Sequence, residues 1–294
     1  MKFASSFGAV TIGVSAAVLG LLSALSGAAR SEPARIIPKP VAGKPPVEIN
    51  AHYKITLNGF DLGDLQFKSR ADQGAYRADS DVQVSALLGA FSWHGVTHST
   101  GSMAAGSYRP ADYSFDFNGT TRSGSVKMGF KGDTVASLAS EPQSYTTADT
   151  VPLEQKHLKG VLDPLSAILA MTRVDGADPC GRKLAIFDGK QRFDLVLSFS
   201  RNEAASQPIA SGQPGVDIVC KVRYVPIAGY WATEETWALA ANNGIEIAFR
   251  PVPSAGLMLP HRVVIPTIAG DAVLQAAEVN IVTNNRDRVA FVDE

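Results

Sequence analysis

His52-Tyr53-Lys54-Ile55-Thr56-Leu57-Asn58-Gly59 is the run from which the prediction of the fold class starts. Tyr53, Ile55 and Leu57 alternate with polar neighbours, which is the pattern of a strand with one buried face. Asn58-Gly59 favours a tight turn, because both positions accept a positive φ. A return strand is expected to begin at residues 65–67. The run therefore predicts a β-hairpin.

Similar alternating runs follow along the chain, separated by turn residues such as Asn118-Gly119, Lys131-Gly132-Asp133 and Asp188-Gly189. We expect strands at residues 76–87, 91–100, 113–117, 125–130, 134–138, 183–187, 192–200, 216–225, 237–239, 244–249, 257–265 and 272–282. Consecutive strands at this spacing pair antiparallel with their neighbours. The sequence predicts an all-β fold, a long antiparallel meander curled into an open barrel or β-spiral.

One segment interrupts the strand pattern. Asp163 suits an N-cap and Pro164 suits the first helical position. Leu165, Ile168 and Leu169 follow at helical spacing. We expect a short amphipathic helix at residues 163–173 that packs against the sheet.

The first 29 residues are typical of an export signal. Lys2 precedes an uncharged run at residues 7–25, and small side chains follow at residues 26–29. A single transmembrane anchor is the alternative, since the run approaches the length that spans a bilayer. Residues 30–47 contain five prolines and predict a disordered arm. We therefore expect a signal peptide at 1–29, this arm, a single β domain at 48–294, and a periplasmic protein with no stable membrane anchor after cleavage.

Cys180 and Cys220 are the two cysteines of the chain. In an oxidising compartment an even pair is more often bridged than free, so we expect a disulfide. A metal pair and a catalytic thiol are the alternatives, although zinc needs further ligands and no histidine lies between the two cysteines. A formal net charge of -1 with interspersed signs excludes the basic footprint of a nucleic-acid-binding protein.

Catalytic and cofactor motifs are absent from the sequence. It contains neither Gly-x-Ser-x-Gly nor Ser-x-x-Lys, and neither of the usual glycine-rich phosphate-binding patterns. Serines and acids are abundant, so a triad assembled by the fold stays open as an alternative. We expect no catalytic residue, no metal and no cofactor.

Two stretches are candidates for contact with a ligand or a partner. His94 and His98 lie on a predicted strand, about 13 Å apart, which is too far to share one metal ion. They are expected on a solvated sheet face, with Trp93 and His94 at a ligand mouth as the alternative. The aspartates at positions 61, 64, 79 and 81 do not match the EF-hand spacing, and an aspartate beside a glycine in a hairpin usually belongs to the turn.

The second stretch is aromatic and comprises Tyr224, Tyr230, Trp231 and Trp237. Such residues either fill a core or form an exposed patch for a protein or a lipid, because Trp and Tyr suit half-solvated surfaces. Tyr230 and Trp231 are the candidate contacts in the second case.

Several motifs, in this order, are shared with one family. They are residues 57–63 (LNGFDLG), 163–167 (DPLSA), 187–195 (FDGKQRFDL), and 220–224 (CKVRY) continuing to 226–229 (PIAG). Over residues 48–290 the chain resembles the exported proteobacterial family called domain of unknown function 3108. It is more loosely similar to the alphaproteobacterial periplasmic envelope-integrity proteins built as β-spirals. The family resemblance implies no catalytic residues.

The expected function is non-catalytic support of cell-envelope integrity by binding a lipid-like or envelope-derived ligand, because a concave apolar sheet suits such a guest. A periplasmic protein-interaction scaffold that uses a sheet edge or the aromatic stretch is one alternative. A cell-wall or lipid hydrolase is another.

Overall fold

The computed structural model describes residues 48–86, 89–104, 107–143, 149–173, 178–205 and 215–292. All of them lie in one compact unit that spans Arg35–Glu294. The predicted signal peptide and the predicted proline-rich arm lie outside the described residues. Within the described ranges, no helix combines the length and the apolar character needed to cross a membrane.

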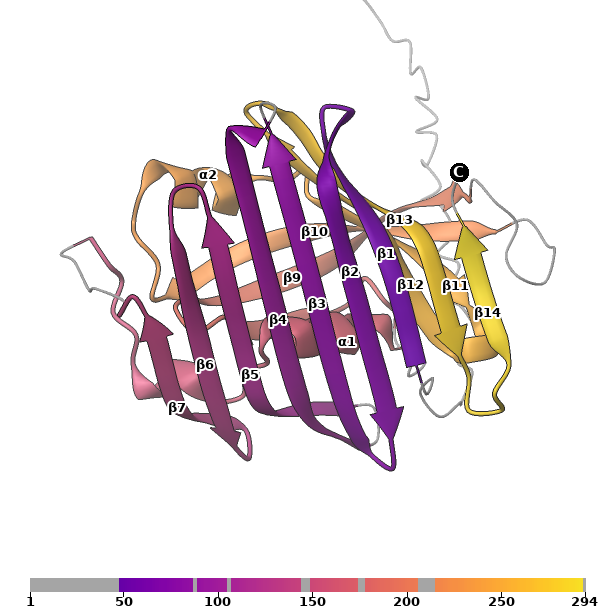
Figure 1. The fold of residues 1–294 in the computed structure, drawn as a ribbon, viewed down its shortest axis with the longest axis horizontal. Helices are drawn as coiled ribbons and strands as arrows, with labels where there is room; N and C mark the ends of the chain where they lie inside the picture. Colours follow the sequence, from indigo (N-terminus) through magenta and orange to yellow (C-terminus); the bar gives the residue numbers. More distant parts are fainter. Residues whose placement is uncertain are drawn as a thin grey trace, which may run out of the picture. The chain divides into compact units, whose positions relative to one another are not determined.

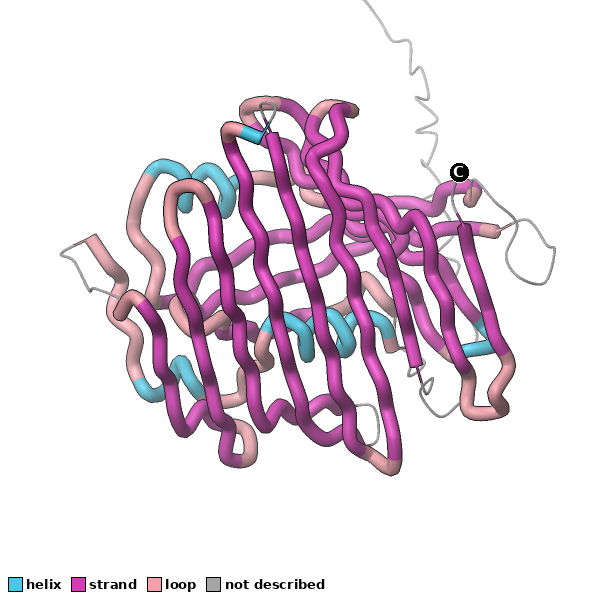
Figure 2. Tube along the Cα trace, viewed as in Figure 1, coloured by secondary structure: helices cyan, strands magenta, loops and turns pink. Residues whose placement is uncertain are grey.

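Antiparallel strands make up most of the described chain, as predicted (Figure 2). The first seven are β1 (Glu48–Leu57), β2 (Phe60–Asp72), β3 (Ala75–Ala86), β4 (Phe91–Ala104), β5 (Ser107–Gly119), β6 (Ser123–Lys131) and β7 (Thr134–Glu141). The later seven are β8 (Lys183–Phe187), β9 (Arg192–Ala204), β10 (Val216–Ala228), β11 (Glu246–Val252), β12 (Leu257–Thr267), β13 (Gly270–Val282) and β14 (Arg288–Val292). The helices are α1 (Pro164–Thr172), α2 (Glu234–Ala241) and the 3-10 helices η2 (Gln155–Leu158) and η3 (Pro253–Ala255).

The described strands form one sheet made of two meanders. β1 to β7 follow one another in sequence order, and so do β8 to β13. The meanders join where β1 pairs with β13, from Glu48 opposite Val282 to Leu57 opposite Ala272. β14 pairs with β13. β7 and β8 are the two ends of this order and do not pair with each other, so the sheet is open, as predicted.

The sheet folds back on itself into two layers. In Figure 1, β9 and β10 cross behind β3 and β4, and α1 lies behind the first layer. α1 contacts β3, β4 and β5 of the first meander and β8 and β12 of the second. The helix therefore lies between the layers rather than on the surface.

α1 begins as the sequence predicts. Asp163 is the N-cap, and its Oδ1 accepts hydrogen bonds from the backbone N–H groups of Leu165 and Ser166, both at 3.0 Å. At the other end, the Arg182 guanidinium donates to the carbonyl oxygen of Ala170 at 2.6 Å. The helix is buried around most of its circumference, since Ser166, Ala167 and Met171 are buried together with the predicted apolar positions Leu165 and Leu169, and Ile168 is partly buried.

Buried side chains form three clusters. The first joins β1 and β13 through residues such as Ile49, Tyr53 and Ile281, and includes Leu165 and Leu169 of α1. The second lies on β8 to β12 and includes Ala167 and Met171 of α1. The third contains Tyr113, Met128, Val135, Val161 and Phe187, and so connects β5 to β7 with β8. The helix thus contributes to two clusters at once.

The strand predicted at residues 237–239 is wrong. These residues lie in α2, where Thr233 is the N-cap and Glu234 and Glu235 occupy the first turn. Acidic residues in a first turn favour a helix through its dipole. α2 has no buried residue, so there was no apolar periodicity to reveal it.

Cys180 and Cys220 form the predicted disulfide, with 5.2 Å between their Cα atoms. Cys220 lies in β10, and Cys180 lies in the segment that precedes β8. Both residues are fully buried in the second cluster. The bridge therefore anchors the segment just before β8 to β10.

Candidate functional site

The outward face of the first meander is polar and carries three His–Asp pairs. His52 Nε2 lies 3.2 Å from Asp64 Oδ1, and His94 Nε2 lies 3.0 Å from Asp81 Oδ1. His98 pairs separately with Asp79. The structure therefore places the predicted histidines on a partly exposed sheet face, each with its own carboxylate.

Trp93 and His94 both line one open hollow of the surface, but their side chains diverge. They are consecutive in β4, so their side chains point to opposite faces of the sheet. The Trp93 ring lies 6.2 Å from Phe115 and 6.5 Å from Phe117, measured between centroids. His94 faces outward toward Asp81.

An open hollow lies on this outward face. We call it the outer hollow. Its volume is about 650 Å³. Its polar side chains come from β1 to β5 and are those of His52, Lys54, Asp61, Asp64, Gln83, Ser85, Ser92, His94 and Asn118. β2 bends there at Gly63, where an added Cβ would lie 2.0 Å from the carbonyl oxygen of Gln83. Glycine at this position thus allows the close approach of β2 and β3.

The residues of the aromatic stretch are divided between the core and the surface. Tyr230 is buried, and its ring packs edge-on against Trp237 at 5.8 Å. Trp231 is 43% exposed, and the Lys190 ammonium lies 3.7 Å from the centroid of its ring. Of the two predicted contacts, Trp231 presents its ring to solvent and Tyr230 packs inward.

A segment of chain crosses the gap between the two ends of the sheet. We call residues 149–163 the strap. It pairs with the end of β10, where Val151 N donates to Tyr230 O at 2.9 Å and Gly229 N donates to Val151 O at 2.8 Å. Leu162 then lies beside Ile186 of β8 in a parallel bridge. The strap therefore covers the β8 edge around Ile186.

The strap covers the start of the β7 edge. Thr134 bridges to Lys159 of the strap. Beyond it, the consecutive residues from Ala136 to Ala139 are exposed, and β7 ends the strand order. Leu138 stands opposite Met128, on the face that carries the core, yet it is 44% exposed. Within the described part of the chain, the stretch from Ala136 to Ala139 therefore has no neighbouring strand on this side.

A groove of about 520 Å³ runs beside this edge. We call it the β7 groove. One wall is β7 at Leu138, and the strap supplies Pro152 and Leu153. Lys190 and Gly229 form the opposite wall. An added Cβ at Gly229, where φ is +76°, would lie 2.0 Å from the carbonyl oxygen of Lys190, so glycine lets these two turns meet. Sequence reasoning missed this groove because its walls lie far apart in the chain.

A buried polar cluster lies under α1. Ser99 Oγ donates to Asp163 Oδ2 at 3.0 Å, Ser166 Oγ donates to the same oxygen, and the hydroxyls of Tyr76 and Ser166 are 2.6 Å apart. Burial raises the pKa of Asp163 above its ordinary value and that of Tyr76 to about 12. Ser99, Asp163 and Ser166 have no exposed surface, so a substrate does not reach the two hydroxyls. The cluster is suited to holding α1 against β3 and β4.

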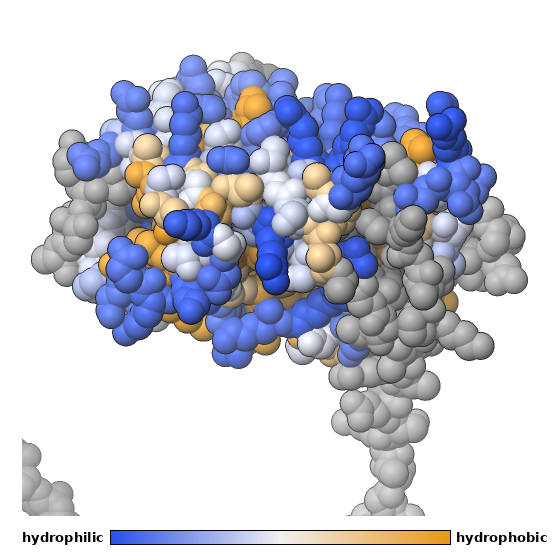
Figure 3. Space-filling view, turned by 90° about the horizontal axis from the view of Figure 1, so that it is seen from below, coloured by the Kyte–Doolittle hydropathy of each residue, from blue (hydrophilic) through white to orange (hydrophobic). Residues whose placement is uncertain are grey.

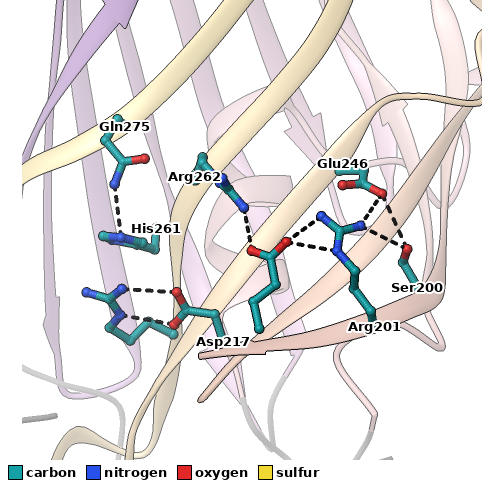
Figure 4. Close-up of polar contacts among 9 residues, drawn as sticks. Ser200, Arg201, Asp217, Glu246, His261, Arg262 and Gln275 are labelled. Atoms are coloured by element: carbon teal, nitrogen blue, oxygen red, sulfur yellow. Dashed lines mark hydrogen bonds and ion pairs between the residues drawn. The ribbon is translucent and has the colours of Figure 1, made fainter. Parts of the chain in front are cut away.

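The second meander carries an internally paired charge network (Figure 4). Arg250 makes two 3.0 Å hydrogen bonds to Asp217, and both side chains are almost wholly buried. Arg201 donates to Glu246 at 2.7 Å, and this hydrogen bond holds the pKa of Glu246 below its usual range. Arg262 donates to Glu203 at 2.5 Å. Each arginine of this network already faces a carboxylate, so the network is not suited to an ionic ligand.

The described residues contain no group of three histidine, cysteine, aspartate or glutamate side chains placed to hold a metal ion. On the face seen in Figure 3, hydrophobic residues form patches between hydrophilic ones. We take the β7 groove with the nearby Trp231 and the outer hollow as candidate binding regions.

One family model matches the chain, at residues 52–275, and its description is "Protein of unknown function (DUF3108)". Neither a curated protein nor a solved structure matches.

Proposed function

Because the chain belongs to the DUF3108 family, whose description names no activity, we propose a function from the surface of this chain. The protein is an exported, non-catalytic binding protein of the cell envelope. It captures an extended segment of a partner protein in the β7 groove. The exposed stretch from Ala136 to Ala139 at the end of the sheet, beside the β7 groove, is the observation that carries this proposal.

Export is supported by two features of the chain. The uncharged run at residues 7–25 ends in small side chains, as a cleavable signal does. The buried Cys180–Cys220 bridge is the kind of bond that forms and persists in an oxidising compartment such as the periplasm.

An extended polypeptide fits the groove better than a lipid chain does. Peptide groups along an open strand edge are satisfied by another backbone, which adds as a further strand, whereas an acyl chain leaves them without partners. Leu138 and Leu153 give alternate side chains of such a segment apolar contacts. Lys190 provides one positive charge, so the segment carries an acidic group near it.

The β7 edge has one of the usual protections against pairing, a bulge at Ala136 where its register with β6 shifts, but it lacks the others. Exposed edges commonly carry lysine, proline or a bulge turned outward. Residues 136–140 read Ala-Ser-Leu-Ala-Ser and contain neither charge nor proline. An edge of this composition, across the β7 groove from Lys190 and the half-exposed Trp231 that Lys190 contacts, is suited to a partner rather than to solvent alone.

Binding of defined peptides tests the proposal. The probes are short peptides of alternating valine and threonine that carry either one aspartate or one lysine, followed by fluorescence anisotropy. We expect the aspartate series to bind and the lysine series to bind more weakly. Backbone N-methylation of the bound peptide abolishes binding, since it removes the donors of the added strand.

Variants of the protein locate the site. Leu138→Lys, at an exposed position, is expected to abolish binding, and Trp231→Ala to weaken it about tenfold or more, as removal of an aromatic anchor does. Phe60→Ala is the matched control, because Phe60 is 74% exposed in the β1–β2 turn. The proposal is wrong if palmitate binds in the groove and the peptides do not, or if Leu138→Lys binds peptide like the wild type.

A further inference from the structure

The outer hollow contains hydrogen-bonding groups that the protein itself does not use. Lys54 and Gln83 line it, and their side chains have no hydrogen-bond or ion-pair partner among the described residues. An ammonium group donates hydrogen bonds, and an amide both donates and accepts them. These two groups are available to a ligand.

Other lining groups are held in place by their neighbours. His52 and His94 each contact a carboxylate through Nε2, which orients the ring and leaves Nδ1 as its remaining polar atom. Ser123 Oγ donates to Asn118 Oδ1 at 3.0 Å, which fixes the amide of Asn118. Side chains oriented in advance lose less freedom when a ligand binds.

The charges around the hollow argue against an ionic ligand. Lys54 is the cation among the residues that line it, and Asp61 and Asp64 are the anions. These two carboxylates repel a polyanion, and Lys54 repels a polycation. A metal ion lacks a suitable group of ligands in the described chain.

The extent of the hollow fits a chain-like ligand. Its polar side chains come from five adjacent strands. Because neighbouring strands lie about 4.8 Å apart, they span roughly 19 Å. This length accommodates several linked monosaccharide units.

We propose that the outer hollow binds a neutral oligosaccharide. Sugar hydroxyls both donate and accept hydrogen bonds, so they match the mixture of ammonium, amide, imidazole and carboxylate groups around the hollow. The hollow shares no lining residue with the β7 groove. The glycan-binding proposal and the peptide-binding proposal can therefore be tested independently of each other.

Titration of the full chain with three neutral tetrasaccharides, of N-acetylglucosamine, glucose and galactose, tests the proposal by NMR. We expect at least one to bind with a dissociation constant on the order of millimolar. The shifted resonances are expected to include those of His52, Lys54, Gln83 and His94. Inorganic phosphate and spermidine are the ionic probes, and neither is expected to shift these resonances.

Gln83→Ala and Lys54→Ala are expected to weaken binding several-fold while the spectrum keeps the dispersion of the folded protein. Gln66→Ala is the matched control, because Gln66 is an exposed glutamine on the neighbouring strand that does not line the hollow. The proposal is overturned if no tetrasaccharide binds, if phosphate or spermidine binds at these residues instead, or if Gln66→Ala weakens binding as much as Gln83→Ala.

Discussion

Asp163 shows how one side chain connects a helix to a sheet. Its carboxylate accepts hydrogen bonds from two backbone N–H groups of α1 and from the hydroxyls of Ser99 and Ser166. Burial is the largest influence on its pKa and raises it above the ordinary value of 3.8. The folded protein therefore retains a proton on Asp163 at pH values where the unfolded chain has lost it.

The raised pKa of Asp163 determines how the stability of the protein changes with pH. Where the folded state binds more protons, the free energy of unfolding falls as the pH rises. The contribution of Asp163 is fully present below about pH 3.8 and is lost as the pH rises through its folded pKa. We predict that Asp163→Asn flattens this part of the profile, measured as urea unfolding at a series of pH values.

Asp116→Asn serves as the control, because Asp116 is exposed on β5. Its profile is expected to follow that of the wild type. Parallel profiles for the wild type and Asp163→Asn would show that the prediction is wrong. Asp163→Ala is expected to destabilise the protein by roughly 1–3 kcal/mol, since it removes the N-cap and the acceptor of two buried hydroxyls.

The disulfide acts at the scale of elements, since it fixes the segment before β8 to β10. It closes a loop with a sequence separation of 40. We predict that the double variant Cys180→Ala/Cys220→Ala loses about 2–4 kcal/mol of unfolding free energy, because its unfolded chain is less constrained. Urea unfolding of both proteins without reductant measures the difference.

Both cysteines are buried, so a reductant reaches them mainly through unfolded molecules. Dithiothreitol is therefore expected to lower the wild-type unfolding midpoint to that of the double variant. It leaves the double variant itself unchanged. Equal stability of the two proteins without reductant would contradict the stabilising role of the bridge.

Elements whose signals are local in sequence could be predicted, and the others could not. β1 followed from the alternation of Tyr53, Ile55 and Leu57, and α1 from Asp163 and Pro164. α2 carries no buried residue, so no apolar pattern supported the helix that its capping residue and acidic first turn favour. Trp231 was identified as a candidate contact, but the β7 groove depends on the strap meeting β7 and β10, which no local pattern shows.

At the scale of the described unit, the seam between β1 and β13 connects the two meanders. Ten residues of β1, from Glu48 to Leu57, pair along β13. Side chains of both meanders and of α1 share the first hydrophobic cluster. Elements that share one core lose it together, so the meanders are expected to unfold in a single cooperative transition.

Tryptophans in the two meanders provide separate reporters of this transition. Trp93 lies in β4, whereas Trp231 and Trp237 follow β10. The double variant Trp231→Phe/Trp237→Phe reports on the first meander, and Trp93→Phe reports on the second. We predict that, in each variant, the urea midpoint from tryptophan fluorescence coincides with the midpoint from circular dichroism, which follows all strands.

A substitution at the seam tests directly whether the two meanders unfold together. Ile281 of β13 is 1% exposed, so Ile281→Ala in each reporter background is expected to cost about 2–5 kcal/mol by leaving a cavity in the shared cluster. Both reporters are expected to shift by the same amount, because neither meander retains the cluster without the other. Ile268→Ala is the control, since Ile268 is fully exposed in the β12–β13 turn. A shift confined to Trp231 and Trp237 would mean that the first meander folds without the seam.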